Sequence, residues 1–210
     1  MLKSRFIFTL VVSLFSIAAN ATASSDLSGL LKGIRSMKAD FTQTIFDNRD
    51  KPIQKSYGNM ALVRPGKFLW QTTKPIPQLI IANDSRLWIY DPDLEQVTIR
   101  ALHKATGESP ALLLSHEDAE IDHDYTVKTI SKKAGKWFVL IPRGEDSVFE
   151  QVEMGFNGAE LTEMRLQDHI GHHTQILFKH TQTNVNIPAS LFTFKKTANI
   201  DVIDETKHKR

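Results

Sequence analysis

The feature that most constrains the fold of this chain is an alternation of apolar and polar residues, repeated in many short segments. Successive side chains of a strand point to opposite faces, so each segment is typical of a half-buried strand. Pro-Gly, Pro-x-Pro, Asn-Asp and Asp-Pro sequences between the segments favour tight turns. The segments are 39–47, 56–63, 67–73, 78–84, 86–92, 95–102, 125–131, 136–142, 149–156, 160–168, 174–182 and 190–196. Because short connections join most neighbours, we expect one antiparallel sheet of about eleven strands.

Two segments break this alternation and predict helices. A helix capped by Ser24 and its neighbours has apolar residues at helical spacing and ends near Lys38. A second, short helix has Ser109 as its cap and Pro110 at its first position. Its first turn, 111–114, is apolar on every side, so it must be buried or must cover an apolar surface. The apolar residues of the first helix are Leu27, Leu30, Leu31, Ile34 and Met37.

Two short helices cannot cover both faces of a sheet this large. We therefore expect a mainly β chain whose antiparallel sheet curls into a barrel or half-barrel. A barrel of this size leaves room inside for a ligand, and the apolar strand residues predict a hydrophobic cavity. The short helix would then close the mouth of this cavity as a helical lid.

The N-terminus is typical of a secretory signal peptide. Basic residues precede an apolar run over residues 6–19, which is shorter than the ~20 residues that a membrane-spanning helix needs. Two Ala-x-Ala sequences follow and place the cleavage site after Ala21 or Ala23. We expect a signal peptide over residues 1–23 and a single domain over residues 24–210.

Charge and cysteine content limit the partners and the compartment. The whole chain has 26 basic and 24 acidic side chains, and the signal peptide removes two basic ones, so the mature net charge is zero. A nucleic-acid partner would need a basic patch or stripe, and none is expected. The chain has no cysteine, which is common in a bacterial periplasm and leaves no site for an N-terminal lipid. We expect a free, soluble periplasmic monomer.

Sequence signals for catalysis are weak. Nucleophile-elbow, Walker and dinucleotide-binding motifs are missing, so we expect no enzyme and no cofactor. One cluster, His169, His172 and His173, has residues that bind transition metals, and a metal-dependent enzyme is the alternative that it suggests. The favoured interpretation is a polar hairpin turn around Gly171, with no metal.

Arg64 lies beside a Pro-Gly turn and precedes a strand rich in aromatic residues. Phe68 and Trp70 share one face of that strand, and Trp88 and Tyr90 share one face of a later one. Such side chains can fill a core or can line a ligand cavity. The curled sheet favours the cavity, because few helices are available to fill its middle.

Four motifs occur in register: Arg64-Pro65 before Phe68-x-Trp70, Leu87-Trp88-x-Tyr90-x-Pro92 before Glu95-Gln96, Thr106-Gly107-x-x-Pro110, and the C-terminal "SLFTF" with "IDVIDE". In these motifs, and over essentially the whole mature chain, the sequence resembles the LolA family of periplasmic outer-membrane lipoprotein carrier proteins. The resemblance implies an incomplete, half-open antiparallel β-barrel of about eleven strands with a helical lid over a hydrophobic cavity.

The resemblance implies a chaperone that accepts lipoproteins from an inner-membrane ABC-type releasing complex and delivers them to the outer-membrane receptor LolB. It implies that Arg64 latches the lid backbone in the closed, empty form. Acyl chains of the cargo would occupy a cavity lined by Phe68, Trp70, Trp88, Tyr90, Leu112, Leu113 and Leu114. An alternative within the same fold is a binding module for free lipid, or a sensor of lipoproteins.

Overall fold

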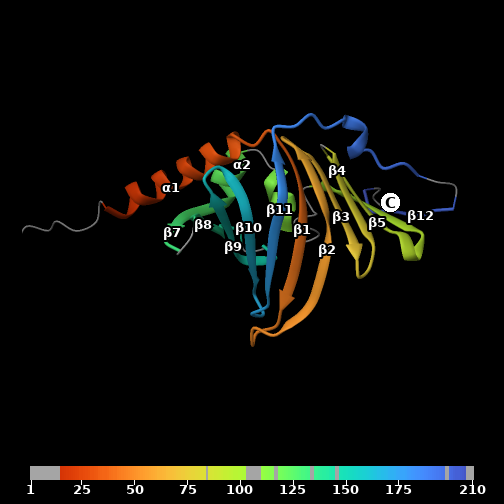
Figure 1. The fold of residues 1–210 in the computed structure, drawn as a ribbon, viewed down its shortest axis with the longest axis horizontal. Coiled ribbons are helices and arrows are strands. Elements are labelled where there is room, and N and C mark those ends of the chain that lie inside the picture. The colour runs from red at the N-terminus through yellow and green to blue at the C-terminus, as the bar shows by residue number, and fades with distance from the viewer. Residues whose placement is uncertain are drawn as a thin grey trace, which may run out of the picture.

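A single twelve-stranded sheet dominates the fold in the computed structural model (Figure 1). The structure describes residues 15–83, 85–102, 110–115, 118–132, 135–144, 147–196 and 199–206. The strands are β1 (Ser36–Phe46), β2 (Pro52–Val63), β3 (Lys67–Lys74), β4 (Gln78–Asn83), β5 (Arg86–Asp91), β6 (Gln96–Ala101), β7 (Tyr125–Ile130), β8 (Lys136–Pro142), β9 (Phe149–Asn157), β10 (Glu160–Asp168), β11 (His173–Thr183) and β12 (Asp201–Asp204).

The strand order is β12-β6-β5-β4-β3-β2-β1-β11-β10-β9-β8-β7, so the described strands form an open sheet with β12 and β7 at its edges. The expected mainly β, incompletely closed architecture is confirmed. Pairing is antiparallel throughout except between β12 and β6, which run parallel. β1 and β11 pair directly, and this pairing joins the N-terminal and C-terminal halves of the meander in one sheet.

The helices differ from the expected ones in their bounds. They are α1 (Phe15–Lys32), η1 (Pro92–Leu94), η3 (Pro110–Ser115), α2 (Asp118–Asp124) and η4 (Ala189–Phe192). α1 contains the expected cleavage position and ends at Lys32; the expected end near Lys38 is wrong because β1 already begins at Ser36. Ile34 and Met37 are nevertheless buried in the core, as their apolar character predicts. Over the residues that can be described, no helix has the length and apolar character to cross a membrane.

One large hydrophobic cluster fills the space on one face of the sheet, which we call the inner face. It joins side chains from β1–β5 with side chains from β7–β11, although these strands are far apart in the sheet order. Such contacts require the sheet to curl around the cluster. Buried residues of α1, η3 and α2 belong to the same cluster, so these helices supply the core that the sheet cannot form alone.

A smaller cluster lies on the opposite, outer face of β2–β4. It contains Ile187 and Phe192 from the segment that follows β11, packed on Ala61, Leu69 and Ile81. We call residues 185–194 the strap. The expected strand over 190–196 is wrong: the strap crosses strands whose backbone groups are already paired with one another, so it packs by side chains and forms only the short helix η4.

Three aromatic rings lie together on the inner face. Phe41 of β1 stacks on Trp70 of β3, with ring centroids 3.6 Å apart, and Phe68 lies 6.2 Å from Trp70. Gly58 of β2 lies between β1 and β3, and a Cβ there would be 2.7 Å from the Phe41 ring and 1.9 Å from the Gln71 carbonyl oxygen. The missing side chain therefore allows rings from β1 and β3 to meet across β2.

We expect Gly58→Ala to lower the free energy of unfolding by about 1–3 kcal/mol, because the added methyl group must displace a backbone carbonyl and the Phe41 ring. Gly29→Ala is the control. Gly29 is an exposed residue of α1 with no atom within 4 Å of an added Cβ, so this change should stabilise the protein by about 0.5–1 kcal/mol. Urea denaturation of both variants measures the difference. If the two variants had the same urea midpoint, the close packing at Gly58 would be contradicted.

Candidate functional site

A short apolar helix covers part of the inner face. Within η3, Ala111, Leu112, Leu113 and Leu114 are all buried and belong to the same cluster as the sheet aromatics. The Ser115 hydroxyl donates to the Leu112 carbonyl oxygen at 2.8 Å and so closes the last turn. The expected short helix is thus present as η3, a 3-10 helix of six residues whose leucines belong to the apolar cluster. Its expected cap, Ser109, and the Thr106-Gly107 pair lie outside the described residues.

The turn between β2 and β3 contacts the end of this helix directly. The Gly66 N–H donates to the Ser115 carbonyl oxygen at 2.9 Å, and the Arg64 N–H donates to the Arg35 carbonyl oxygen at 2.9 Å. Gly66 has a φ of 75°, a conformation that glycine adopts without strain. The predicted latch residue, Arg64, is half-buried and lies two positions from the bond that joins the turn to η3.

Phe68 and Trp70 share the inner face of β3, the strand that lies next to η3. Both are buried in the cluster that also contains Leu112, Leu113 and Leu114. Phe41, which the sequence analysis did not include in the site, stacks on Trp70. Its place in the alternation of β1 was visible in the sequence, but its contact with β3 depends on Gly58 in the intervening strand.

The structure does not bring Trp88 and Tyr90 to this surface. In the β4–β5 ladder Trp88 pairs with Ile81 and Tyr90 pairs with Leu79, so both side chains face outward. Trp88 packs against the outer cluster beneath the strap, and the Tyr90 ring lies 5.4 Å from the Phe194 ring. The inner-face positions of β5 belong to Leu87 and Ile89. The four aromatic residues therefore cannot line one cavity together.

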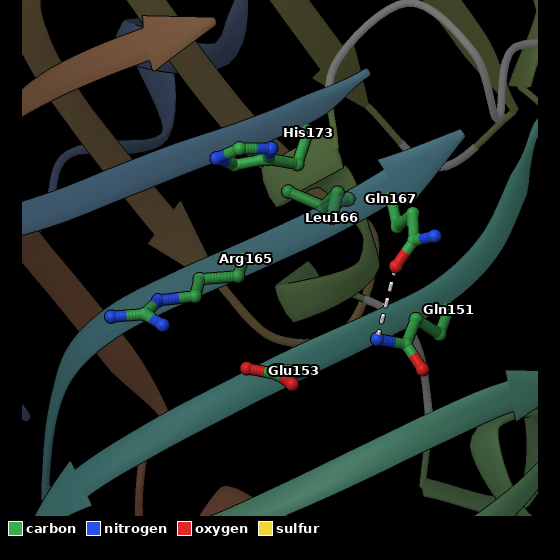
Figure 2. Close-up of a pocket in the computed structure, with 6 residues that line it drawn as sticks. All are labelled: Gln151, Glu153, Arg165, Leu166, Gln167 and His173. Carbon is green, nitrogen blue, oxygen red and sulfur yellow. Dashed lines mark hydrogen bonds between the residues drawn. The ribbon is translucent and has the colours of Figure 1, made fainter. Parts of the chain in front are cut away.

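A hollow of about 150 Å³ lies on the outer face of β9–β11 (Figure 2). Its rim is mostly polar, and its side chains bond to one another: Gln151 Nε2 donates to Gln167 Oε1 at 3.4 Å, and Lys132 donates to Glu153 at 2.5 Å. Ligand pockets usually enclose about 300–1,000 Å³ and are mainly apolar. This hollow is therefore no site for an acyl chain. The residues that line it are Gln151, Glu153, Arg165, Leu166, Gln167 and His173.

The histidine cluster forms a hairpin turn between β10 and β11, as predicted. Asp168 Oδ1 accepts the backbone N–H groups of Ile170 and His172, and His169 Nε2 lies 2.8 Å from the Ser147 carbonyl oxygen. His173 is the first residue of β11, and its ring stacks on Phe46 at 4.5 Å. Across the described ranges, no group of three or more potential ligands is arranged to hold a metal ion.

Three pKa shifts have local structural causes. The backbone N–H groups of Lys51 and Arg49 lower the pKa of Asp47 in the β1–β2 turn. Burial raises the pKa of the Tyr125 phenol at the start of β7. A hydrogen bond from the Arg100 side chain lowers the pKa of Glu205 beside β12. These groups belong to a turn and to the two edge strands, so their shifts give no indication of acid–base chemistry at the apolar surface.

Known proteins match this chain over nearly its whole length. The family model described as "Outer membrane lipoprotein carrier protein LolA" matches residues 32–195. The outer-membrane lipoprotein carrier protein of Dechloromonas aromatica is 38% identical, over 92% of this chain and 93% of its own length. That of Methylobacillus flagellatus is 40% identical, over 94% and 97% respectively.

Solved structures share the fold at low sequence identity. A LolA superfamily protein from Nitrosomonas europaea has a TM-score of 0.51 at 12% identity, over 82% of this chain and 98% of its own length. An uncharacterized conserved protein from Thermus thermophilus has a TM-score of 0.56 at 10% identity, over 88% and 99%. These likenesses concern the architecture alone.

We expect Zn²⁺ to leave the melting temperature unchanged. A bound ion at 100 times its dissociation constant would stabilise the protein by ~2.7 kcal/mol, which corresponds to several degrees. The reference is a variant with His169, His172 and His173 replaced by asparagine, whose response to Zn²⁺ should equal that of the wild type. A zinc-dependent rise in the wild type that the variant lacks would show that the hairpin binds metal.

Proposed function

Because this chain belongs to the LolA family of outer membrane lipoprotein carrier proteins, we propose that it is a periplasmic chaperone for lipoproteins and has no enzymatic activity. It accepts lipoproteins that an ABC-type complex releases from the inner membrane. It shields their acyl chains on the inner face of the sheet, and it delivers them to the receptor LolB at the outer membrane.

The observation that carries this proposal is the packing of η3 on the inner face. η3 lies next to β2 and β3, its leucines belong to the same buried cluster as Phe41, Phe68 and Trp70, and a backbone hydrogen bond joins the end of η3 to the β2–β3 turn. Moving η3 away would expose these apolar side chains to a guest. An acyl chain makes the same apolar contacts as leucine side chains do, so the guest and the lid compete for one surface.

For a carrier to release its cargo, the free energies of its closed, empty state and of its cargo-bound state must be close. Burial of an acyl chain contributes ~0.8 kcal/mol for each CH₂ group, so half of one long chain contributes several kcal/mol. Complete burial of several chains would approach the limit of non-covalent affinity, and the cargo would never leave. A closed state in which the leucines of η3 occupy the same surface offsets part of this energy and allows transfer.

Arg64 is the proposed latch of the closed state. It lies in the turn whose Gly66 N–H bonds the end of η3, and this closeness in the chain supports a contact between the Arg64 side chain and the lid backbone. A charge-assisted hydrogen bond contributes about 1.5–3 kcal/mol, which is enough to bias two states of similar energy without trapping either. The acyl-chain surface itself is assigned to Phe68, Trp70, Leu112, Leu113 and Leu114, with Phe41 added.

The experiment that tests this function is the release of lipoproteins from spheroplasts. Purified mature protein, added to spheroplasts with an active releasing complex, should bring newly made lipoproteins into the medium as a soluble complex. Bovine serum albumin, which binds free fatty acids, serves as the control for unspecific lipid extraction. If the protein binds free fatty acid but releases no lipoprotein, the chain is a lipid-binding module and this proposal is wrong.

A test of the proposed acyl-chain surface uses the three tryptophans of the chain. Of these, only Trp70 faces inward. Trp137 pairs with Gly155 on β9, beneath the Lys132 ammonium on the outer face, and Trp88 lies beneath the strap. A brominated fatty acid quenches the fluorescence of a tryptophan that it contacts. We expect it to quench a variant that keeps only Trp70, with phenylalanine at positions 88 and 137.

The matched control keeps only Trp88, with phenylalanine at positions 70 and 137. The brominated fatty acid should quench its fluorescence no more strongly than dissolved bromide ions do. The same fatty acid without bromine measures any change in fluorescence that binding itself causes. Equal quenching of the two single-tryptophan variants would place the acyl chain elsewhere than on the inner face.

A test of the proposed latch is Arg64→Leu. This change removes the guanidinium donor and adds an apolar side chain near the lid. The variant should still load lipoprotein from the inner membrane but should transfer it to LolB about ten- to a hundredfold more slowly, as the loss of a charged hydrogen bond implies. Arg64→Lys should be intermediate, because one ammonium cannot reproduce the guanidinium fork. Loading and transfer are measured separately.

Arg86→Leu is the control, since Arg86 is exposed beside the β4–β5 turn, at the same end of the sheet. It should load and transfer normally. If Arg64→Leu loads weakly but transfers its cargo at the normal rate, Arg64 belongs to a docking surface and is no latch.

A further inference from the structure

The sheet edge at β12 is held differently from the other strands. β12 is only four residues long and is parallel to its neighbour β6, in a sheet that is otherwise antiparallel. None of the side chains of Asp201–Asp204 is buried; the nearest buried residue is Ile200, which precedes the strand. Backbone pairing without side-chain burial contributes little net stability, so β12 belongs to the least stable part of the fold.

A side-chain contact between β6 and the residue after β12 helps to hold this end of the strand. Arg100 of β6 donates to Glu205 through Nε at 2.8 Å and through Nη2 at 3.2 Å. The two side chains are 34% and 45% exposed, and ion pairs in such positions are weak. The pair therefore sets the register of β12 more than it secures the strand.

Departure of β12 would uncover a usable strand edge on β6. The Asp201 N–H donates to the Glu95 carbonyl oxygen and the Glu205 N–H to the Ile99 carbonyl oxygen, both at 2.9 Å. The odd-numbered residues of this stretch, Val97 included, therefore direct their backbone groups toward β12, and the even-numbered ones face β5. Unpaired groups of this kind are a template for a strand from another chain.

The outward side of β12 is protected against such an addition. The Val202 N–H donates to the Asp201 carboxylate at 2.9 Å, and the Thr206 N–H donates to the Asp204 carboxylate at 3.0 Å. Carboxylates that occupy backbone donors in this way block a further strand from pairing outside β12. A partner that uses this edge must replace β12.

We propose that the edge of β6 is a docking site for an extended acidic segment of a partner polypeptide. The segment takes the place of β12, pairs with β6 in the same parallel direction and presents a carboxylate to Arg100, as Glu205 does in the free protein. The strap, held by Ile187 and Phe192, keeps the displaced β12 close by. This site is independent of the acyl-chain surface on the inner face.

The probe is a fluorescein-labelled peptide with the sequence of residues 200–206, which reproduces the segment that β6 already binds. It should bind the full mature chain, and Glu205→Gln in the protein should tighten binding about two- to fivefold, because the resident strand loses its ion pair. The same change in the peptide should weaken binding by a similar factor, because Arg100 then loses the carboxylate of the probe.

A reversible disulfide between β6 and β12 provides the matched control. Val97 and Val202 are paired across β6 and β12, and the chain has no cysteine of its own, so Val97→Cys with Val202→Cys introduces a single disulfide. The reduced variant should bind the probe as the wild type does, and the oxidised one should not bind. Equal binding in both states would overturn the proposal.

Hydrogen exchange tests the opening of β12 without any variant. The amides of Val97 and Ile99 should exchange at least tenfold faster than that of Leu69, in the centre of β3. Exchange of all three at one common, slow rate would show that β12 leaves only on global unfolding and would overturn the proposal. A concentration-dependent dimer that exchanges β12 between two copies would also overturn it, because the occupant would then be this chain itself.

Discussion

The structure depends on one constraint: a curled sheet cannot fill its own concave side. The inner face of this sheet carries apolar side chains from ten of its strands, and one cluster joins them with α1, η3 and α2. α1 lies against the β7 edge, and η3 lies near β2 and β3. Within the described part of the chain, the core beneath η3 is thus closed by this six-residue helix. A core closed so locally can open there while α1 and the rest of the sheet stay folded.

Under the function proposed above, the lid acts as an internal substitute for a ligand. Burial of a leucine side chain contributes roughly 1.5–3 kcal/mol, and the burial of a few CH₂ groups of an acyl chain contributes as much. In the proposed carrier, the three leucines of η3 and an acyl chain would therefore compete with comparable energies for the surface that contains Phe68 and Trp70. Exposed aromatic rings alone would bind lipid too tightly or would aggregate. A surface that is always covered, by the lid or by cargo, avoids both outcomes.

Much of this fold was predictable because the signals are local. Alternation and turn residues predicted eleven of the twelve strands, and the apolar turn at 111–114 predicted a covering helix. The faces of individual strands were harder to predict. Phe68-x-Trp70 and Trp88-x-Tyr90 look alike in the sequence, but a shift of one residue in register exchanges the two faces of a strand, and the β4–β5 turn sends the second pair outward. β12 escaped prediction because four residues with two aspartates carry no strand signal, and its pairing depends on a distant partner.

The outward position of Trp88 explains why the chain continues past β11. Two aromatic residues on the outer face of β5 would expose a large apolar surface to water, next to Ile81 and Leu69. The strap covers this surface with Ile187 and Phe192, and Phe194 approaches Tyr90. On the other half of the outer face, β9–β11 carry polar side chains that bond to one another and need no cover. The same alternation that places Phe68 and Trp70 beneath the lid thus requires a second covering segment behind the sheet, and the course of that segment brings β12 to the edge of β6.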